Sequence, residues 1–252
     1  MTDFQISDDS LIILGAAYAG KEAVGVIAEL MKEMLGPSAR AIGKGIAAPI
    51  EAWAERRVKS ASDTVFTAAR TIADSGGTAR PVPGRILGPL LEKSSLEEEP
   101  DLRARWAALL ANASMTPDAV LPSFVSILGE LSPIEARLLQ RIYELSIQYA
   151  PIVARTNNPN NTEADHLRSK QIIDALTQES LMESVGVLSA SAFIVYATNL
   201  ERLMLISQGD ADSDLPGANW PIVTTSFGDA FMAACMTPIE REGVHGYVHV
   251  RP

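Results

Sequence analysis

The sequence has few of the residues that most enzymes use for catalysis. It contains one cysteine, Cys235, and three histidines, and the apolar run FMAACM around Cys235 favours a buried thiol over a nucleophile. No G-x-S-x-G, H-E-x-x-H or paired-cysteine motif occurs. We therefore predict no catalytic residue, no metal site and no cofactor. Carboxylates brought together by the fold are the one route to catalysis left open.

Positive charge and aromatic residues are also scarce. Lysine and arginine total 21 against 31 acidic residues, which gives a formal net charge of -10. Nucleic-acid binding depends mainly on neutralising phosphates, so this balance argues against nucleic acid as the partner. Aromatic residues make up 6% of the chain, and alternating Val, Ile and Thr are rare outside the C-terminus. Both features predict a mainly α protein with a helical N-terminal region.

Long hydrophobic runs are missing as well. The uncharged run Leu11 to Gly20 is about half as long as a membrane-spanning helix. Asp3, Asp8 and Asp9 precede it where a signal peptide carries positive charge. We expect neither secretion nor a spanning helix. The single cysteine excludes an intrachain disulfide and suits a reducing compartment, which predicts a cytoplasmic protein, with the periphery of the inner membrane as the alternative location.

Residues 1–75 are predicted to form a helical hairpin. Apolar residues recur there at spacings of three and four, and a glycine- and proline-rich linker follows at 75–83. Small residues four apart, such as Gly15 and Ala19, allow helices to approach closely. Tight packing in water is the simpler interpretation. A change of state, in which the hairpin inserts into a membrane or assembles, is the alternative.

Residues 81–131 contain three apolar helical runs separated by prolines and acidic residues. Pro100 follows Glu97, Glu98 and Glu99, and this combination predicts the start of a helix, because negative charge is favourable at a helix N-terminus. The apolar faces of the three helices are predicted to be buried. Their residues are Ile86, Leu87, Leu90 and Leu91, then Leu102, Trp106, Leu109, Leu110 and Ala113, then Phe124, Ile127 and Leu128.

The same stretch resembles a known protein family. Its matching residues are Pro83, Ile86, Pro89 to Glu92, Leu102, Trp106, Ala107, Leu109 to Ala111, Pro122 to Val125, Ile127, Leu128 and Leu131 to Pro133. This ordered set is similar to the abortive-infection alpha (Abi-alpha) family, formerly a domain of unknown function, and the resemblance covers roughly residues 30–240. It implies a role in bacterial defence against phage. The family pattern offers no catalytic residues.

Residues 132–240 are predicted to form a winged-helix-like α+β domain. Helices are expected in LSPIEARLLQRIYEL, HLRSKQIIDALTQ and the first part of LSASAFIVYATNLERLMLIS, whose end runs into a strand. A polar stretch at 150–165 is predicted to be an irregular loop. A second loop, a short strand at 220–224 and a helix at 226–236 complete the pattern. An extended tail, 241–252, could pair as an edge strand with another chain, which predicts a possible dimer.

Within this domain a protein contact is favoured over DNA. The expected recognition helix carries only Arg202, and the expected wing loop carries Asp210, Asp212 and Asp214, which would repel phosphate. Convergence of Arg168 and Lys170 with Arg202 on one face would reverse that preference.

Basic residues are the candidate contacts with a membrane or a partner. Those near the N-terminus would attract anionic lipid, although acidic residues in the same region offset them. The possible interaction surface consists of Lys44, Arg56, Arg57, Arg168, Lys170 and Arg202.

Three functions follow from these observations. The first is a non-enzymatic anti-phage protein that acts through helix-mediated membrane or protein interaction, by binding a protein partner or by self-association. The second is a winged-helix regulatory or protein-interaction module. The third is an enzyme whose site is assembled across domains.

Overall fold

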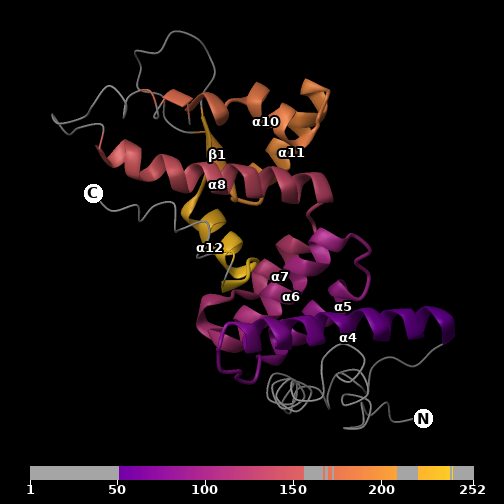
Figure 1. The fold of residues 1–252 in the computed structure, drawn as a ribbon. Helices are drawn as coiled ribbons and strands as arrows, with labels where there is room; N and C mark the ends of the chain where they lie inside the picture. Colours follow the sequence, from indigo (N-terminus) through magenta and orange to yellow (C-terminus); the bar gives the residue numbers. More distant parts are fainter. Residues whose placement is uncertain are drawn as a thin grey trace. The chain divides into compact units, whose positions relative to one another are not determined.

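The chain forms two compact units that are built mainly from helices (Figure 1). A computed structural model describes residues 51–155, 167, 170–171, 173–208, 221–238 and 240. Among these, residues 51–130 and 234–238 belong to the first unit, and the residues between 131 and 233 belong to the second. The predicted mainly α class is confirmed, with one two-stranded sheet in the described part of the chain.

The first unit begins with helix α4 (Glu51–Asp74), which ends in a Schellman turn. Gly76 adopts the left-handed conformation, with φ at 65°, and its N–H donates to the Ala73 carbonyl at 3.0 Å. The N–H of Gly77 donates to the Ile72 carbonyl, also at 3.0 Å. Because glycine adopts positive φ without a steric penalty, Gly76 stops the helix at this point.

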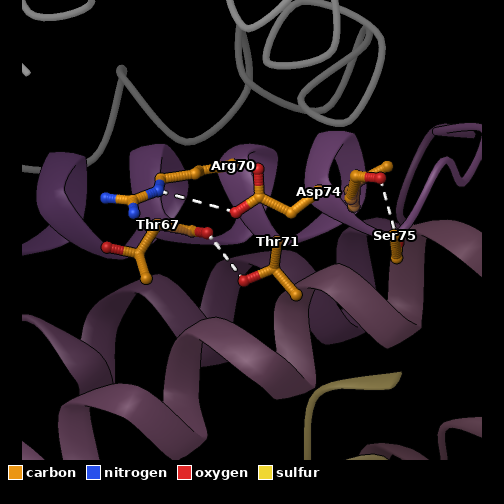
Figure 2. A network of polar contacts seen from close by, with 6 residues as sticks. Thr67, Arg70, Thr71, Asp74 and Ser75 are labelled. Carbon is orange, nitrogen blue, oxygen red and sulfur yellow. Dashed lines mark hydrogen bonds and ion pairs between the residues drawn. The ribbon is translucent and has the colours of Figure 1, made fainter. Parts of the chain in front are cut away.

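Short-range polar contacts support the last turns of α4 (Figure 2). The Thr71 hydroxyl donates to the Thr67 carbonyl at 3.0 Å, and the Arg70 guanidinium lies 3.6 Å from the Asp74 carboxylate. The Ser75 hydroxyl donates to a carbonyl one turn back, at 2.9 Å. The ion pair is exposed, so its contribution to stability is small.

Three short apolar segments complete the helices of this unit. They are α5 (Gly84–Ser94), α6 (Pro100–Met115) and α7 (Pro122–Leu128), with a 3-10 turn, η1 (Pro117–Ala119), before α7. A proline is the first residue of α6, η1 and α7, where its missing N–H is not needed. The predicted helix start at Pro100 is confirmed.

Helix α6 is the centre of the first unit. It is buried without interruption from Trp106 to Ser114 and packs against α4. The predicted apolar faces are buried, except that Leu91 is only half-buried. The side chains that α4 contributes to this core are Val65, Phe66, Ala68, Ala69 and Ile72.

The C-terminal segment 234–238 also belongs to the first unit. The Asn112 side-chain amide, on α6, donates to the carbonyls of Ala234 and Met236, both at 2.9 Å. All three residues are buried. One amide side chain therefore holds a segment that lies more than a hundred residues away in the sequence.

The second unit contains the two-stranded sheet, four helices whose bounds are described, and helical residues at 167, 170–171 and 173–175, within the predicted helix HLRSKQIIDALTQ. The elements are α8 (Pro133–Arg155), α10 (Gln178–Val185), α11 (Ala190–Arg202), β1 (Ile206–Gln208), β2 (Ile222–Thr224) and α12 (Ser226–Ala234). Strands β1 and β2 are antiparallel, with Ile206 opposite Thr224. The Ser146 hydroxyl of α8 accepts from the N–H of Thr224 at 3.0 Å and so fixes the sheet against that helix.

One sequence prediction needs correction in this unit, and one helix was missed. Residues 150–155 were predicted to be irregular, but α8 continues through them to Arg155. The apolar residues Ile152 and Val153 extend the helical pattern, so the polar run begins only after the helix has ended. Helix α10 was not predicted at all.

Candidate interaction surface

Helices α10 and α11 form a sharply bent pair, and each is bounded by local capping. Thr177 caps α10, and Gly186 ends it in the left-handed conformation, with φ at 72°. The Ser189 hydroxyl then accepts from the N–H of Ala192 and caps α11. These caps confine the chain between the helices to a short turn, across which the two axes meet at 97°.

One side of α11 is buried and the other is exposed. Phe193 and Leu200 point into the core of the second unit. On the opposite side Ile194 is 54% exposed and Val195 is 65% exposed, while Leu188, in the preceding turn, is 99% exposed. We define the α11 face as these three residues together with the exposed hydroxyl residues Ser191 and Thr198.

The α11 face carries no charge. No charged residue occurs in the sequence between Glu183 and Glu201, although the chain as a whole carries a net charge of -10. Exposed apolar residues that are scattered singly are common in proteins, whereas exposed apolar residues that gather on one face mark candidate interaction sites.

A buried carboxylate holds α11 against the start of α8. Glu135 is 5% exposed, and one of its oxygens accepts from the Asn199 side-chain amide at 2.7 Å. Its other oxygen accepts from the N–H of Ser132 at 2.7 Å, while the Ser132 hydroxyl accepts from the N–H of Glu135. This reciprocal pair is a capping box. Because Glu135 both caps α8 and accepts a hydrogen bond from α11, it fixes the position of α11 relative to the start of α8.

The comparison with protein-family models identifies the chain. A model described as abortive infection alpha matches residues 68–235, about two thirds of the sequence. The chain belongs to the abortive infection alpha family. The resemblance inferred from the sequence is therefore confirmed, and the matched region includes the whole of α11. Comparisons with curated proteins and with solved structures give no match.

The basic residues predicted as contacts of this abortive infection alpha protein are only partly described. Lys44 and Arg168 lie outside the described residues, as do the side chains of Arg56 and Arg57. Lys170 is exposed. Arg202 is exposed at the end of α11, where its Nε donates to the Asn199 side-chain oxygen at 3.0 Å. Convergence of Arg168 and Lys170 with Arg202, the arrangement that would favour DNA, involves Arg168, which lies outside the described residues.

The thiol of this family member is poorly placed for chemistry. Burial raises the pKa of Cys235 from 9.0 to about 12, and the nearby charge of Arg105 lowers that pKa only in part. The thiol is therefore protonated at neutral pH. No group of three or more His, Cys, Asp or Glu side chains that could hold a metal occurs in the described part of the chain.

The described part of each unit has an open hollow on its surface. A hollow of about 310 Å³ between α4 and α6 includes Asp63 and Arg103 in its lining, and one of about 250 Å³ between α8 and α10 includes Arg137 and Arg141. In the second hollow Arg141 lies 3.9 Å from Glu144, which also accepts from the Gln140 amide at 2.9 Å. The Glu144 carboxylate in this hollow is therefore already engaged by Arg141 and Gln140.

A helix that spans a membrane must be both long and apolar. Among the described residues no single helix meets that requirement. Helices α10 and α11 meet it only as a pair, on length and composition, and they are bent by 97°.

Sequence reasoning missed the α11 face, although it named the cation Arg202 on the same helix. The signal available was the uncharged run SVGVLSASAFIVYATNL, which is unusual in a chain this acidic. Its periodicity alone does not say which apolar residues face outward, because apolar residues occur on both sides of the helix.

Proposed function

We propose that this abortive infection protein acts by binding a protein through the α11 face, without catalysing a reaction. The observation that carries the proposal is the exposure of Leu188, Ile194 and Val195 on a face without charge. Exposing these three apolar side chains to water is unfavourable, and a protein partner that covers them would recover that free energy.

We further propose that the second unit is a winged-helix domain adapted to protein contact. The 97° bend between α10 and α11 falls within the range of helix-turn-helix motifs, and α11 is the second helix of the pair. The antiparallel strands β1 and β2 follow it, as a wing would. In a DNA-binding member of this architecture, α11 would be the recognition helix.

The side chains of α11 favour protein over DNA as its partner. Arg202 is the one cation in the helix sequence, and its Nε is engaged by Asn199. DNA binding draws on several phosphate contacts from basic side chains, which the α11 face does not offer. Salt-sensitive retention of the purified protein on DNA would support the regulatory DNA-binding alternative.

Membrane contact through the N-terminal region is a separate proposal. It assigns residues 1–75 to a helical hairpin, whose last helix, α4, packs against α6 within the first unit. Lys44, Arg56 and Arg57 would face anionic lipid. We place the protein in the cytoplasm, at or near the inner membrane. Failure of the full chain to sediment with anionic vesicles would contradict the membrane contact.

A phage challenge tests the role of the α11 face. Bacteria would express the wild-type chain, Ile194→Glu, or the control Leu96→Glu, and plaque formation and culture survival would be recorded at low and at high phage dose. Leu96 is 57% exposed, close to the 54% of Ile194, but it lies in the first unit. The control therefore adds the same charge at an equally exposed position.

We expect the wild type and the control to protect the culture at low dose and to let it collapse at high dose. Ile194→Glu should lose protection, because covering a carboxylate in a partner contact is costly. Immunoblotting would establish equal protein abundance. If Ile194→Glu protects as well as the wild type, the α11 face is not the contact surface.

A further inference from the structure

We infer that the partner of the α11 face is the α11 face of a second copy of this chain, with the two helices antiparallel about a two-fold axis. The inference rests on the proposed function, whose contact surface it uses. Three features of the face support it: its lack of charge, the spacing of its residues and the symmetry of their chemistry.

The charge of the chain limits how two copies can meet. Each carries a formal net charge of -10, so contacts between acidic surfaces of two copies are repulsive. The α11 face has no charge of its own. Ser191, Ile194, Val195 and Thr198 can therefore meet the same four residues of a second copy without like charges between them.

The face has the spacing of a helix-packing seam. Ser191, Ile194, Val195 and Thr198 occupy positions i, i+3, i+4 and i+7, which form one stripe along a helix. All four are exposed. Ile194 and Val195 are β-branched and stiff, so they lose little conformational freedom when they are covered.

The stripe is also self-complementary when it is reversed. Its order is hydroxyl, β-branched, β-branched, hydroxyl. An antiparallel two-fold axis between Ile194 and Val195 places Ile194 of one copy against Val195 of the other, and Ser191 against Thr198. A symmetric dimer requires this kind of self-complementary patch, since the same surface serves both partners.

The test measures the molar mass of the full chain by sedimentation equilibrium over a wide range of protein concentration. Wild type should show a concentration-dependent dimer. Ile194→Glu should weaken dimer formation by at least about tenfold, because each introduced carboxylate would meet an apolar side chain of the other copy. Leu96→Glu should dimerise like the wild type. Far-UV circular dichroism would check that each variant is folded.

A double variant makes the test specific to this geometry. In Ile194→Glu with Val195→Lys, each introduced carboxylate faces the introduced ammonium group of the other copy. Neighbouring positions on one helix do not face each other, so the two groups do not pair within one copy. The double variant should therefore dimerise more strongly than either single variant. A double variant no stronger than the single variants would overturn the proposed pairing.

The outcomes separate this inference from the proposed function. A wild-type chain that is monomeric at every concentration, or a dimer that Ile194→Glu leaves unchanged, overturns the inference. If Ile194→Glu nevertheless abolishes phage protection, the face binds something else and the proposed function stands. Loss of vesicle binding in Ile194→Glu, with a monomeric wild type, would instead identify a lipid surface as the partner and would overturn the proposed protein contact as well.

Discussion

Replacing Asn112 with aspartate should release the C-terminal segment of the first unit. Asn112 is 2% exposed, and its amide nitrogen donates to the carbonyls of Ala234 and Met236. Aspartate has nearly the same shape as asparagine. When ionised, the introduced side chain has no donor for the two carbonyls, and when protonated it has a single O–H donor in place of the two amide N–H groups. The substitution therefore changes the hydrogen bonding with little change in packing volume.

The expected magnitude follows from the two hydrogen bonds. A net contribution of about 1 kcal/mol for each bond, with a penalty for carbonyls left buried without their donor, gives about 3 kcal/mol in favour of opening. Since about 1.4 kcal/mol corresponds to a tenfold change in an equilibrium constant, the open population of segment 234–238 should rise by about 100-fold.

Cys235 reports on that opening because it lies between the two held carbonyls. It is buried and its pKa is raised to about 12, so a thiol reagent should react with it only when the segment opens. The rate of labelling at neutral pH should rise by about two orders of magnitude in Asn112→Asp. Ser126→Ala, an exposed change on α7, is the control. A labelling rate within about threefold of the wild type would refute the role of Asn112, since the estimated effect is far larger.

Two further predictions concern stability. The pKa of Cys235 is raised from 9.0 to about 12 by burial, so its stabilising contribution is fully present below about pH 9 and is lost as the pH rises toward 12. Relative to Cys235→Ala, the free energy of unfolding of the wild type should fall by about 1.4 kcal/mol per pH unit in that window, measured by urea titration, and a pH-independent difference would contradict this. Gly228→Ala should lower the urea midpoint strongly, because a Cβ at Gly228 would overlap the Leu205 carbonyl group. Gly88, inside α5, is the control, because a Cβ there would meet no atom within 4 Å. Gly88→Ala should leave the urea midpoint unchanged or raise it slightly. Equal effects of the two changes would contradict the clash assigned to Gly228.

The local features of the fold could be predicted from the sequence. The face of α6 was predicted because Leu102, Trp106 and Leu109 repeat at helical spacing, and its start because Pro100 follows acidic residues. Both signals act within one or two turns of the chain. Helix α10 was missed, although Thr177 and Gly186 bound it, because it is short and carries few apolar residues.

The long-range features could not be predicted in this way. The bonds from Asn112 to Ala234 and Met236 join residues more than a hundred positions apart, and no local pattern pairs an amide with distant carbonyls. The contact between Glu135 and Asn199 is of the same kind. The Ser132 to Glu135 capping box joins residues three positions apart, whereas the second hydrogen bond of that carboxylate depends on the fold.

The α11 helix shows how a sequence pattern and an exposed surface together indicate a partner. Its apolar residues occur on both sides, with Phe193 and Leu200 inward and Ile194 and Val195 outward. A helix that is apolar all round is ordinarily covered all round. Among the described residues, the core of the second unit covers the inward side and leaves the outward side exposed. The partner that we propose would cover that outward side.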